Sequence, residues 1–223
     1  MLVINLKNYP IDLDKFLKCL VDLVETKYPV DIVLCPSIAE LSEVKKIVDD
    51  KIRVFAQHCD PKSGSKSTGF ITAEKLHDIG IDGVILNHSE HRISLKEIEY
   101  TLEQLKNVGI PTVVGIERIE DISEMNFQPD YLLYEPSEYI GNSQMTNAKS
   151  VVEEKSSTLR EMKNKFGDLE ILIGAGVKSE TDFEEIYRMD FAGVALSSII
   201  TESENIVEKL EEILMYEKNY GNN

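Results

Sequence analysis

Residues 83–97 read GVILNHSEHRISLKE, a run that predicts one complete strand-to-helix unit. Its first residues are apolar and indicate a short buried strand. Ser94, followed three residues later by Glu97, is a typical start of a helix. The polar residues Asn87–Arg92, with His88 among them, stand between strand and helix. Because α/β proteins carry their sites where parallel strands end, this stretch is the first candidate for chemistry.

The same alternation of a short apolar run and a helical pattern recurs along the chain. The sequence predicts eight strands, at Leu2–Asn5, Asp31–Cys35, Arg53–Gln57, Gly83–Leu86, Thr112–Gly115, Tyr131–Tyr134, Glu170–Gly174 and Gly193–Leu196. It predicts eight helices, at about Leu13–Lys27, Ile38–Asp50, Thr72–Asp78, Leu95–Asn107, Ile119–Asn126, Val151–Lys165, Ser179–Arg188 and Ile206–Lys218. Strands without polar alternation are typical of a parallel sheet that is covered on both faces.

Eight such units within 223 residues favour a closed (β/α)₈ barrel with a parallel eight-stranded core. An open, doubly wound sheet is the structural alternative. No change in composition marks a second domain, so we expect residues 1–223 to form a single domain. The last residues, about 219–223, are expected to fray.

Composition and charge exclude several classes of function. The net charge of −16 argues against nucleic acid and anionic membrane surfaces as partners. Cys19, Cys35 and Cys59 contain no Cys-x-x-Cys pair and indicate a reducing compartment without disulfides. The first residues do not fit a signal peptide, and no apolar run approaches the roughly 18–20 residues of a membrane span. We therefore expect a soluble cytoplasmic protein.

In a barrel of this kind, the residues that follow the strands meet on one face. Asn5 and Lys7 follow the first strand two positions apart, and continued extended backbone would point them the same way. The candidates after the later strands are, in chain order, Gln57, His58 and Asp60; Asn87, His88, Ser89 and Glu90; Glu135; Gly174, Ala175 and Gly176; Ser197 and Ser198. One lysine, one histidine and one glutamate thus arrive from different strands.

Each of these residues, taken singly, also has an ordinary structural interpretation. Lys7 alone fits a solvated rim residue, and His58 alone fits a hydrogen-bonding structural histidine. Glu135 alone fits an exposed loop acid, while His91 and Arg92 fit charges of the outer rim. Only their arrival at one face favours a functional interpretation.

The combined set suits proton abstraction beside a carbonyl group. The small-residue turns after the last two strands could be tight turns or helix caps, but they also offer backbone N–H groups to a phosphate. A cation, an imidazole and a carboxylate base beside such a phosphate site would suit a reaction with an enediolate intermediate. The sequence contains no metal-ligand spacing, serine-nucleophile motif or nucleotide-binding glycine turn. We expect neither a metal nor a cofactor.

Seven segments carry a resemblance that covers nearly the whole chain in order and spacing. They are Asn5-Leu6-Lys7, Phe55–His58, Ser67–Gly69, Asn87–Arg92, Tyr134–Pro136 with Ile140-Gly141, Ile173–Gly176 and Gly193–Ser198. Together they resemble the triosephosphate isomerase family. The histidine segment, the loop after the third strand and the short length resemble its archaeal branch.

The resemblance implies a TIM barrel that interconverts dihydroxyacetone phosphate and D-glyceraldehyde 3-phosphate in glycolysis and gluconeogenesis, without a cofactor. It implies catalytic roles for Glu135 as the base, for a neutral His88 as the electrophile known in this family, and for Lys7 as the cation that stabilises the enediolate. It implies substrate contacts from Asn5, Lys7, Ile140, Gly176, Ser197 and Ser198. Supporting roles fall to Ser89 and to Glu90, the latter as a partner of Lys7.

Two segments depart from the family's usual pattern. The lid reads Ile140-Gly141-Asn142-Ser143 where the family usually has Ile-Gly-Thr-Gly. Ile199 stands where a small residue is usual, next to the phosphate turn. The family is dimeric and its archaeal branch often tetrameric, so the resemblance also implies a homodimer or a homotetramer, with Gly64–Thr68 in the loop that reaches the partner.

Two alternatives stay open at this point. An aldose–ketose isomerase or epimerase acting on a larger sugar phosphate would need a wider mouth and more polar groups than the sequence offers. A non-catalytic metabolite-binding barrel would be favoured by loss of Glu135 or Lys7, and both are present.

Overall fold

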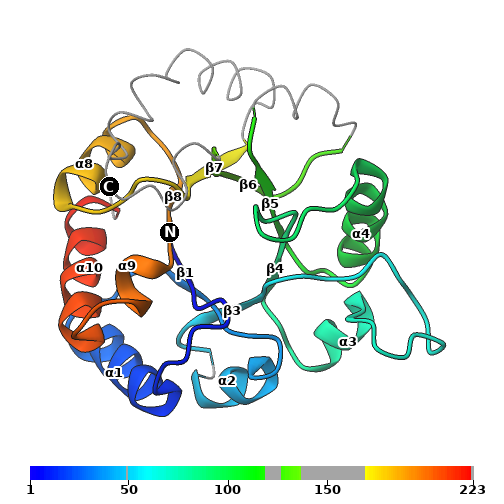
Figure 1. Cartoon of the computed structure of the whole chain (residues 1–223), viewed down its shortest axis with the longest axis horizontal. Coiled ribbons are helices and arrows are strands. Elements are labelled where there is room, and N and C mark those ends of the chain that lie inside the picture. The colour runs from blue at the N-terminus through cyan, green and yellow to red at the C-terminus, as the bar shows by residue number, and fades with distance from the viewer. Residues whose placement is uncertain (49, 119–126, 137–168, 222–223) are drawn as a thin grey trace.

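A computed structural model of the chain describes residues 1–48, 50–118, 127–136 and 169–221. Eight parallel strands close into a barrel in the order of the chain, which confirms the predicted (β/α)₈ barrel and excludes the open sheet (Figure 1). The strands are β1 (Leu2–Asn5), β2 (Ile32–Cys35), β3 (Arg53–Ala56), β4 (Gly83–Leu86), β5 (Thr112–Ile116), β6 (Tyr131–Tyr134), β7 (Glu170–Ile173) and β8 (Gly193–Leu196). Val3 of β1 pairs with Val33 on one side and with Ala195 on the other, and this second pairing closes the ring.

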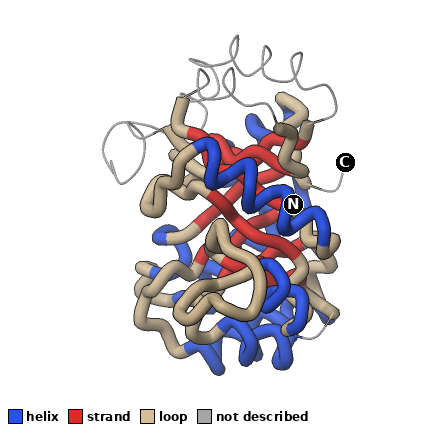
Figure 2. Tube along the Cα trace, turned by 90° about the vertical axis from the view of Figure 1, so that its right-hand side faces the viewer, coloured by secondary structure: helices blue, strands red, loops and turns tan. Residues whose placement is uncertain are grey.

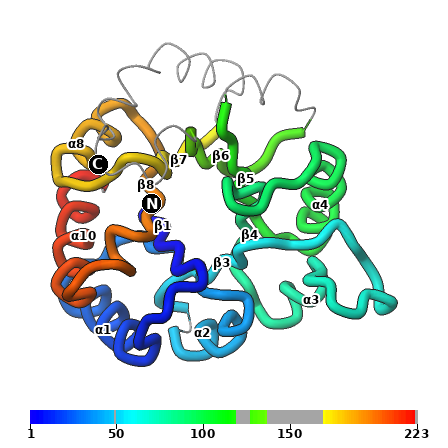
Figure 3. Tube along the Cα trace, viewed as in Figure 1, coloured from blue at the N-terminus to red at the C-terminus, as the bar shows by residue number. Residues whose placement is uncertain are grey.

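Helices surround the barrel, and Figure 2 shows the inclined strands in the middle with the helices outside them. In the described ranges the helices are α1 (Leu13–Thr26), α2 (Leu41–Val48), α3 (Ala73–Asp78), α4 (Leu95–Asn107), α8 (Glu180–Arg188), α9 (Ser198–Thr201) and α10 (Ile206–Tyr220). The last helix, α10, packs between α8 and α1, so the first and last of the described helices are neighbours in the outer layer (Figure 3). None of these helices has the length and apolar character needed to cross a membrane.

The predicted elements that fall in the described ranges are present, and some of them begin or end at other residues than predicted. Four strands and α4 have the predicted bounds. The second helix is shorter than predicted, because a turn in which Glu40 N–H donates to Ser37 O (3.0 Å) precedes α2. The closing helix continues to Tyr220, two residues beyond its predicted end, and α9 was not predicted. The predicted helices at 119–126 and 151–165 and the lid at 140–143 lie outside the described residues.

Hydrogen bonds confirm the predicted helix starts. Asp12 Oδ1 accepts from Lys15 N–H at 3.1 Å ahead of α1. Ser94 and Glu97 form a reciprocal capping box ahead of α4, with N–H donors at 2.8 and 3.3 Å from the opposing side chains. The Asp182 carboxylate accepts from Ser179 N–H and Oγ–H at 2.9 and 2.8 Å ahead of α8. These bonds fix where the loops at the carboxyl ends of the strands must end.

The core has two layers, because successive strand residues face opposite sides. The barrel interior is filled by Met1, Val3, Val33, Cys35, Phe55, Ile85, Val113, Leu133, Leu172 and Ala195, while the alternate residues pack against the helices. Burial on both faces explains the absence of polar alternation in the strands. A Cβ at Gly83 would lie only 2.3 Å from Cζ of Phe55, so the phenyl ring occupies the space at the start of β4.

The three cysteines are free thiols, as predicted. Cys35 and Cys59 are buried, and Cys19 is partly buried. Burial raises the pKa of the Cys59 thiol to about 12, which keeps it protonated and unreactive near neutral pH. Cys35 and Cys59 therefore act as small buried side chains.

Candidate active site

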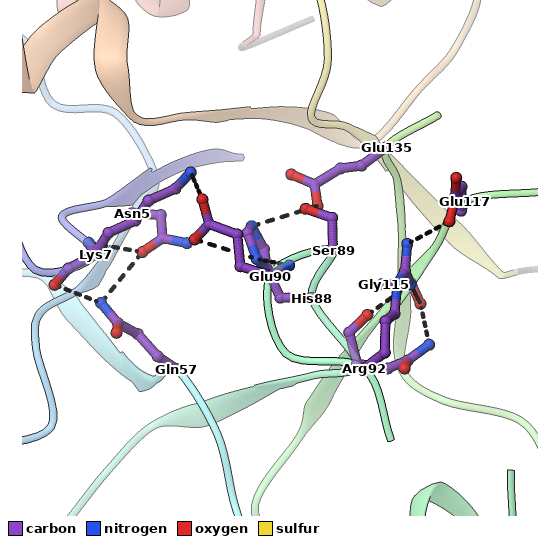
Figure 4. A network of polar contacts seen from close by, with 11 residues as sticks. Asn5, Lys7, Gln57, His88, Ser89, Glu90, Arg92, Gly115, Glu117 and Glu135 are labelled. Carbon is purple, nitrogen blue, oxygen red and sulfur yellow. Dashed lines mark hydrogen bonds and ion pairs between the residues drawn. The ribbon is translucent and has the colours of Figure 1, made fainter. Parts of the chain in front are cut away.

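A pocket of about 830 Å³ opens where the strands end. Its lining includes the predicted site residues that the structure describes, namely Asn5, Lys7, His88, Ser89, Glu90, Glu135, Gly176, Ser197 and Ser198. They come from the loops after β1, β4, β6, β7 and β8, as the barrel geometry requires. Ile140 lies outside the described residues. Figure 4 shows the side chains of the β1, β4 and β6 loops around this space.

The backbone after β1 does not stay extended, so the condition under which Asn5 and Lys7 would point the same way is not met. Lys7 has φ of 49°, in the left-handed region. Asn5 Oδ1 stabilises this turn by accepting from Lys7 N–H at 3.0 Å and from Gln57 Nε2–H at 3.2 Å. Gln57 Nε2 also lies within hydrogen-bond distance of the carbonyl oxygens of Lys7 (3.2 Å) and Cys35 (3.0 Å). The turn, rather than strand periodicity, brings Lys7 to the pocket.

The ammonium group of Lys7 pairs with Glu90, the contact that the resemblance implies. Lys7 Nζ lies 2.7 Å from Glu90 Oε1 (Figure 4). The Glu90 side chain is 57% exposed, so water screens the pair and its net contribution to stability is small. Its main consequence is geometric, because it directs the Lys7 side chain along the pocket wall.

His88 and Glu135 face each other across the pocket. His88 Nε2 lies 3.4 Å from Glu135 Oε2, and the two residues are only 9% and 8% exposed. Ser89 Oγ lies 3.5 Å from the same carboxylate oxygen. The buried carboxylate and the imidazole are therefore close enough to contact the same small molecule.

The tautomer of His88 follows from its other ring nitrogen. Glu90 backbone N–H donates to His88 Nδ1 at 3.2 Å, which requires a lone pair there. The proton of a neutral ring is then on Nε2, on the side of Glu135. The helix α4 begins at Leu95, as predicted, so its first N–H groups are not the donor to His88. The N–H donor comes instead from a turn in which His91 N–H donates to His88 O at 2.9 Å.

Asn87 and Arg92 hold this turn in place. Asn87 has φ of 56°, and its side chain donates to Gly115 O (2.8 Å) and accepts from Ile93 N–H (3.1 Å). Arg92, which the sequence suggested as an outer-rim charge, donates to Asn87 O at 2.8 Å and lies 3.5 Å from Glu117 Oε2. Arg92 thus supports the backbone that carries His88.

Glu135 is placed by the two strands next to β6. Its N–H donates to Ile116 O at 2.9 Å, and Gly174 N–H donates to Tyr134 O at 3.0 Å. A Cβ at Gly174 would lie 2.6 Å from Cγ and 2.7 Å from Oε1 of Glu135. Gly174 therefore leaves the space in which the carboxylate lies.

Small residues line the other end of the pocket. Gly176 has φ of 77°, a conformation that favours glycine. The Oγ of Ser197 is buried and has no hydrogen-bond partner among the described residues. Ser198 begins α9, and Ile199 lines the pocket while packing against the core. A buried, unsatisfied hydroxyl at a pocket wall is a feature that a polar ligand can satisfy.

Comparison with known proteins identifies the family. The model of the family described as triosephosphate isomerase matches residues 1–213. The chain belongs to the triosephosphate isomerase family. It is 32% identical to the triosephosphate isomerase of Methanocaldococcus jannaschii over 78% of this chain and 80% of that protein. It is 30% identical to that of Caldivirga maquilingensis over 96% and 95%, and 26% identical to that of Cenarchaeum symbiosum over 96% of each chain. These relatives are archaeal, as the resemblance suggested.

The pocket of this triosephosphate isomerase family member also includes one tyrosine and three charged residues that the sequence did not reveal. They are Tyr9, Lys178, Glu202 and Lys209. Burial raises the pKa of the Tyr9 hydroxyl, and its hydrogen bond to the Glu202 carboxylate raises that pKa further. Tyr9 lies two positions after Lys7 and could have been suspected on that ground. Glu202 directly follows α9 and Lys209 lies on α10, so no strand end pointed to them.

His58, the other histidine near a strand end, lies outside the pocket lining. Its ring stacks on that of His91 with centroids 4.1 Å apart, and its Nε2 lies 3.5 Å from Asp60 Oδ1. Its ordinary structural interpretation, a hydrogen-bonding histidine, fits this position.

Proposed function

We propose that this chain interconverts dihydroxyacetone phosphate and D-glyceraldehyde 3-phosphate by moving one proton between adjacent carbons. Membership of the triosephosphate isomerase family supports this activity. The observation that carries the chemistry is the buried pair of His88 and Glu135, with Nε2 and Oε2 3.4 Å apart in one pocket with Lys7. The reaction is an internal redox change, so it balances without an external oxidant or reductant.

In the proposed mechanism Glu135 is the base. Its carboxylate takes the proton from the carbon beside the carbonyl group, leaving an enediolate, and then returns a proton to the neighbouring carbon. His88 donates from Nε2 to the carbonyl oxygen as negative charge develops there, which is the neutral-histidine role known in this family. The N–H of Glu90 at Nδ1 supports that role, because it fixes the ring proton on Nε2.

The remaining proposed roles concern charge and binding. Lys7 stabilises the enediolate and the substrate dianion, and Glu90 orients Lys7. Asn5 donates a side-chain hydrogen bond to the substrate, and Ser89 supports Glu135. Gly176, Ser197 and Ser198 hold the phosphate, a proposal supported by the buried, unsatisfied hydroxyl of Ser197. Ile140 completes the set from the segment after β6.

We also propose the setting in which the reaction takes place. The chain acts as one domain, in glycolysis and gluconeogenesis in the cytoplasm. It assembles as a homodimer, or as a homotetramer built from that dimer. The loop containing Gly64–Thr68 also carries Phe70. The side chain of Phe70 is 49% exposed and offers apolar area to a second copy. A solution mass equal to that of one 25.3-kDa chain would contradict the assembly.

A coupled assay with glyceraldehyde 3-phosphate tests the activity. The wild-type chain should turn over the triose phosphate and leave larger aldose phosphates unchanged. Glu135→Gln should lower kcat by about 10²–10⁴-fold, because a positioned base contributes that range. Glu99→Gln, which removes an exposed carboxylate on α4, is the matched control and should retain full activity. No turnover in the wild type, or full turnover in Glu135→Gln, contradicts the proposal.

A further inference from the structure

Two imidazole rings stack outside the pocket, where the loops after β3 and β4 meet. The centroids of the His58 and His91 rings are 4.1 Å apart, and the ring planes are inclined by 26°. The His58 side chain is only 11% exposed, whereas His91 is exposed. This contact joins a buried histidine of one loop to an exposed histidine of the other.

Each of the two histidines also contacts another residue of its own loop. Asp60 closes the β3 loop, since its N–H donates to Ile71 O (2.8 Å) and its Oδ2 accepts from Ile71 N–H (2.6 Å). The other carboxylate oxygen of Asp60 lies 3.5 Å from His58 Nε2. On the opposite side, His91 N–H donates to His88 O at 2.9 Å. The stack therefore connects a closed loop to the turn that orients His88.

We propose that His58 is a positioning residue that holds the turn 88–91 through the ring of His91, and that protonation of this pair releases the hold. Stacked neutral rings attract each other, whereas two imidazolium ions at this separation repel. Release of the turn displaces His88 Nε2, and small displacements of a reacting group lower kcat more than they change binding. The inference rests on the proposed catalytic role of His88.

The charged groups around His58 set the pH range of this effect. His58 faces His91 from the β4 loop, Asp60 from its own loop and Glu97 from α4. Burial lowers the pKa of His58 from its usual 6.5, and the charge of His91 lowers it further, while Asp60 and Glu97 oppose the shift. Because the folded pKa of His58 lies below the unfolded one, the stabilisation that neutral His58 contributes is present above pH 6.5 and is lost as the pH falls through the folded pKa of His58.

Kinetics between about pH 5 and pH 8 test the proposal on two substitutions of His91. His91→Phe keeps a stacking ring that cannot be charged, so kcat near pH 8 should stay within about two-fold of wild type. Near pH 5.5 this variant should retain at least about three-fold more of its pH 8 kcat than wild type does, with KM almost unchanged. His91→Ala removes the ring and should lower kcat several-fold at every pH. His77→Gln, which removes an exposed histidine on α3, is the control and should match wild type.

A second readout follows the ring of His58 itself. The chain has four histidines, so NMR of ¹³C-labelled imidazoles can follow each titration. The titration midpoint of His58 should rise in His91→Phe, because the neighbouring positive charge is removed. Superimposable pH profiles of kcat, or a His58 titration that is unchanged in His91→Phe, overturn the proposal. If the wild-type chain does not isomerise triose phosphate, the proposed function fails and the His58 titration alone decides this inference.

Discussion

Gly174 determines the space available to the catalytic carboxylate that we propose. A Cβ there would come within 2.7 Å of the Glu135 side chain, at both Cγ and Oε1. Cδ1 of Leu133 would lie 2.8 Å away. All three nearest atoms belong to side chains, so these side chains can shift while the backbone of β7 stays in place. At the scale of single residues, the missing methyl group matters because it decides where the base lies relative to His88 Nε2.

The variant Gly174→Ala should therefore lose activity while keeping its fold. We expect kcat to fall by about 10–100-fold, since a displacement of roughly 1 Å at a reacting group can cost that much. The melting temperature should change little. Steady-state kinetics and a thermal melt check both expectations. A wild-type kcat would show that Glu135 does not need the position seen here.

Some site residues could be predicted from sequence because each lies within two positions of the end of a predicted strand. Lys7, His88 and Glu135 fall in that class. The contacts of Gln57 could not be predicted, because they depend on the left-handed backbone of Lys7, which no periodic pattern encodes. The support that Arg92 gives to Asn87 was missed for a similar reason, since a charged residue in a loop resembles a solvated one until its partner is known.

At the scale of elements, the start of α4 fixes the end of the loop that carries His88. Ser94 Oγ accepts a hydrogen bond from Glu97 N–H, and Glu97 Oε2 accepts one from Ser94 N–H. Backbone bonds to Ser94 hold the Glu97 carboxylate and keep its pKa below its usual value. The capping box is therefore the point at which the loop that carries His88 becomes helix.

Ser94→Ala should lower the free energy of unfolding by about 1 kcal/mol, the usual value of a helix N-cap. Urea unfolding followed by circular dichroism gives that number. Isomerase activity below the transition should stay close to wild type, because Asn87, which precedes the turn 88–91, is held by its own side-chain bonds to Gly115 and Ile93. A loss much above 2 kcal/mol would mean that the cap also holds the loop.

The elements that hydrophobic periodicity predicted well are those with long or strongly apolar runs. The strands β1, β4, β6 and β8 and the helix α4 have their predicted bounds. The helix α9 contains four residues, too few to show a helical period, and was missed. The start of α2 was placed early because the apolar residue Ile38 fits the helical pattern, although it lies in the preceding turn.

At the scale of the whole molecule, the number of strands in the sequence favoured a closed barrel, with an open sheet as the alternative. The pairing of β8 with β1 decides that choice, and it joins residues almost 200 positions apart. No local pattern reports such a contact. The barrel interior shows the same dependence, because Phe55 of β3 fills the space that Gly83 leaves at the start of β4.

This interior packing predicts coupling between two strands. Gly83→Ala should destabilise the barrel by about 1–3 kcal/mol, because its Cβ collides with the Phe55 ring. Phe55→Leu shortens that side chain and should absorb part of the collision. In a double-mutant cycle measured by urea unfolding, the pair should be at least about 1 kcal/mol more stable than the sum of the single effects. Strict additivity would contradict the proposed packing.

The central claim is that one carboxylate carries the proton between the two carbons. Isomerisation of D-glyceraldehyde 3-phosphate in D₂O, with the product examined by NMR, tests it most directly. We expect deuterium on the hydroxymethyl carbon of dihydroxyacetone phosphate, because the proton held by Glu135 can exchange with solvent before it is returned. Glu135→Gln should incorporate deuterium about 10²–10⁴-fold more slowly than wild type. Wild-type turnover that yields only protium at that carbon, together with a wild-type rate in Glu135→Gln, would indicate a direct hydride shift and contradict the proposed role of Glu135.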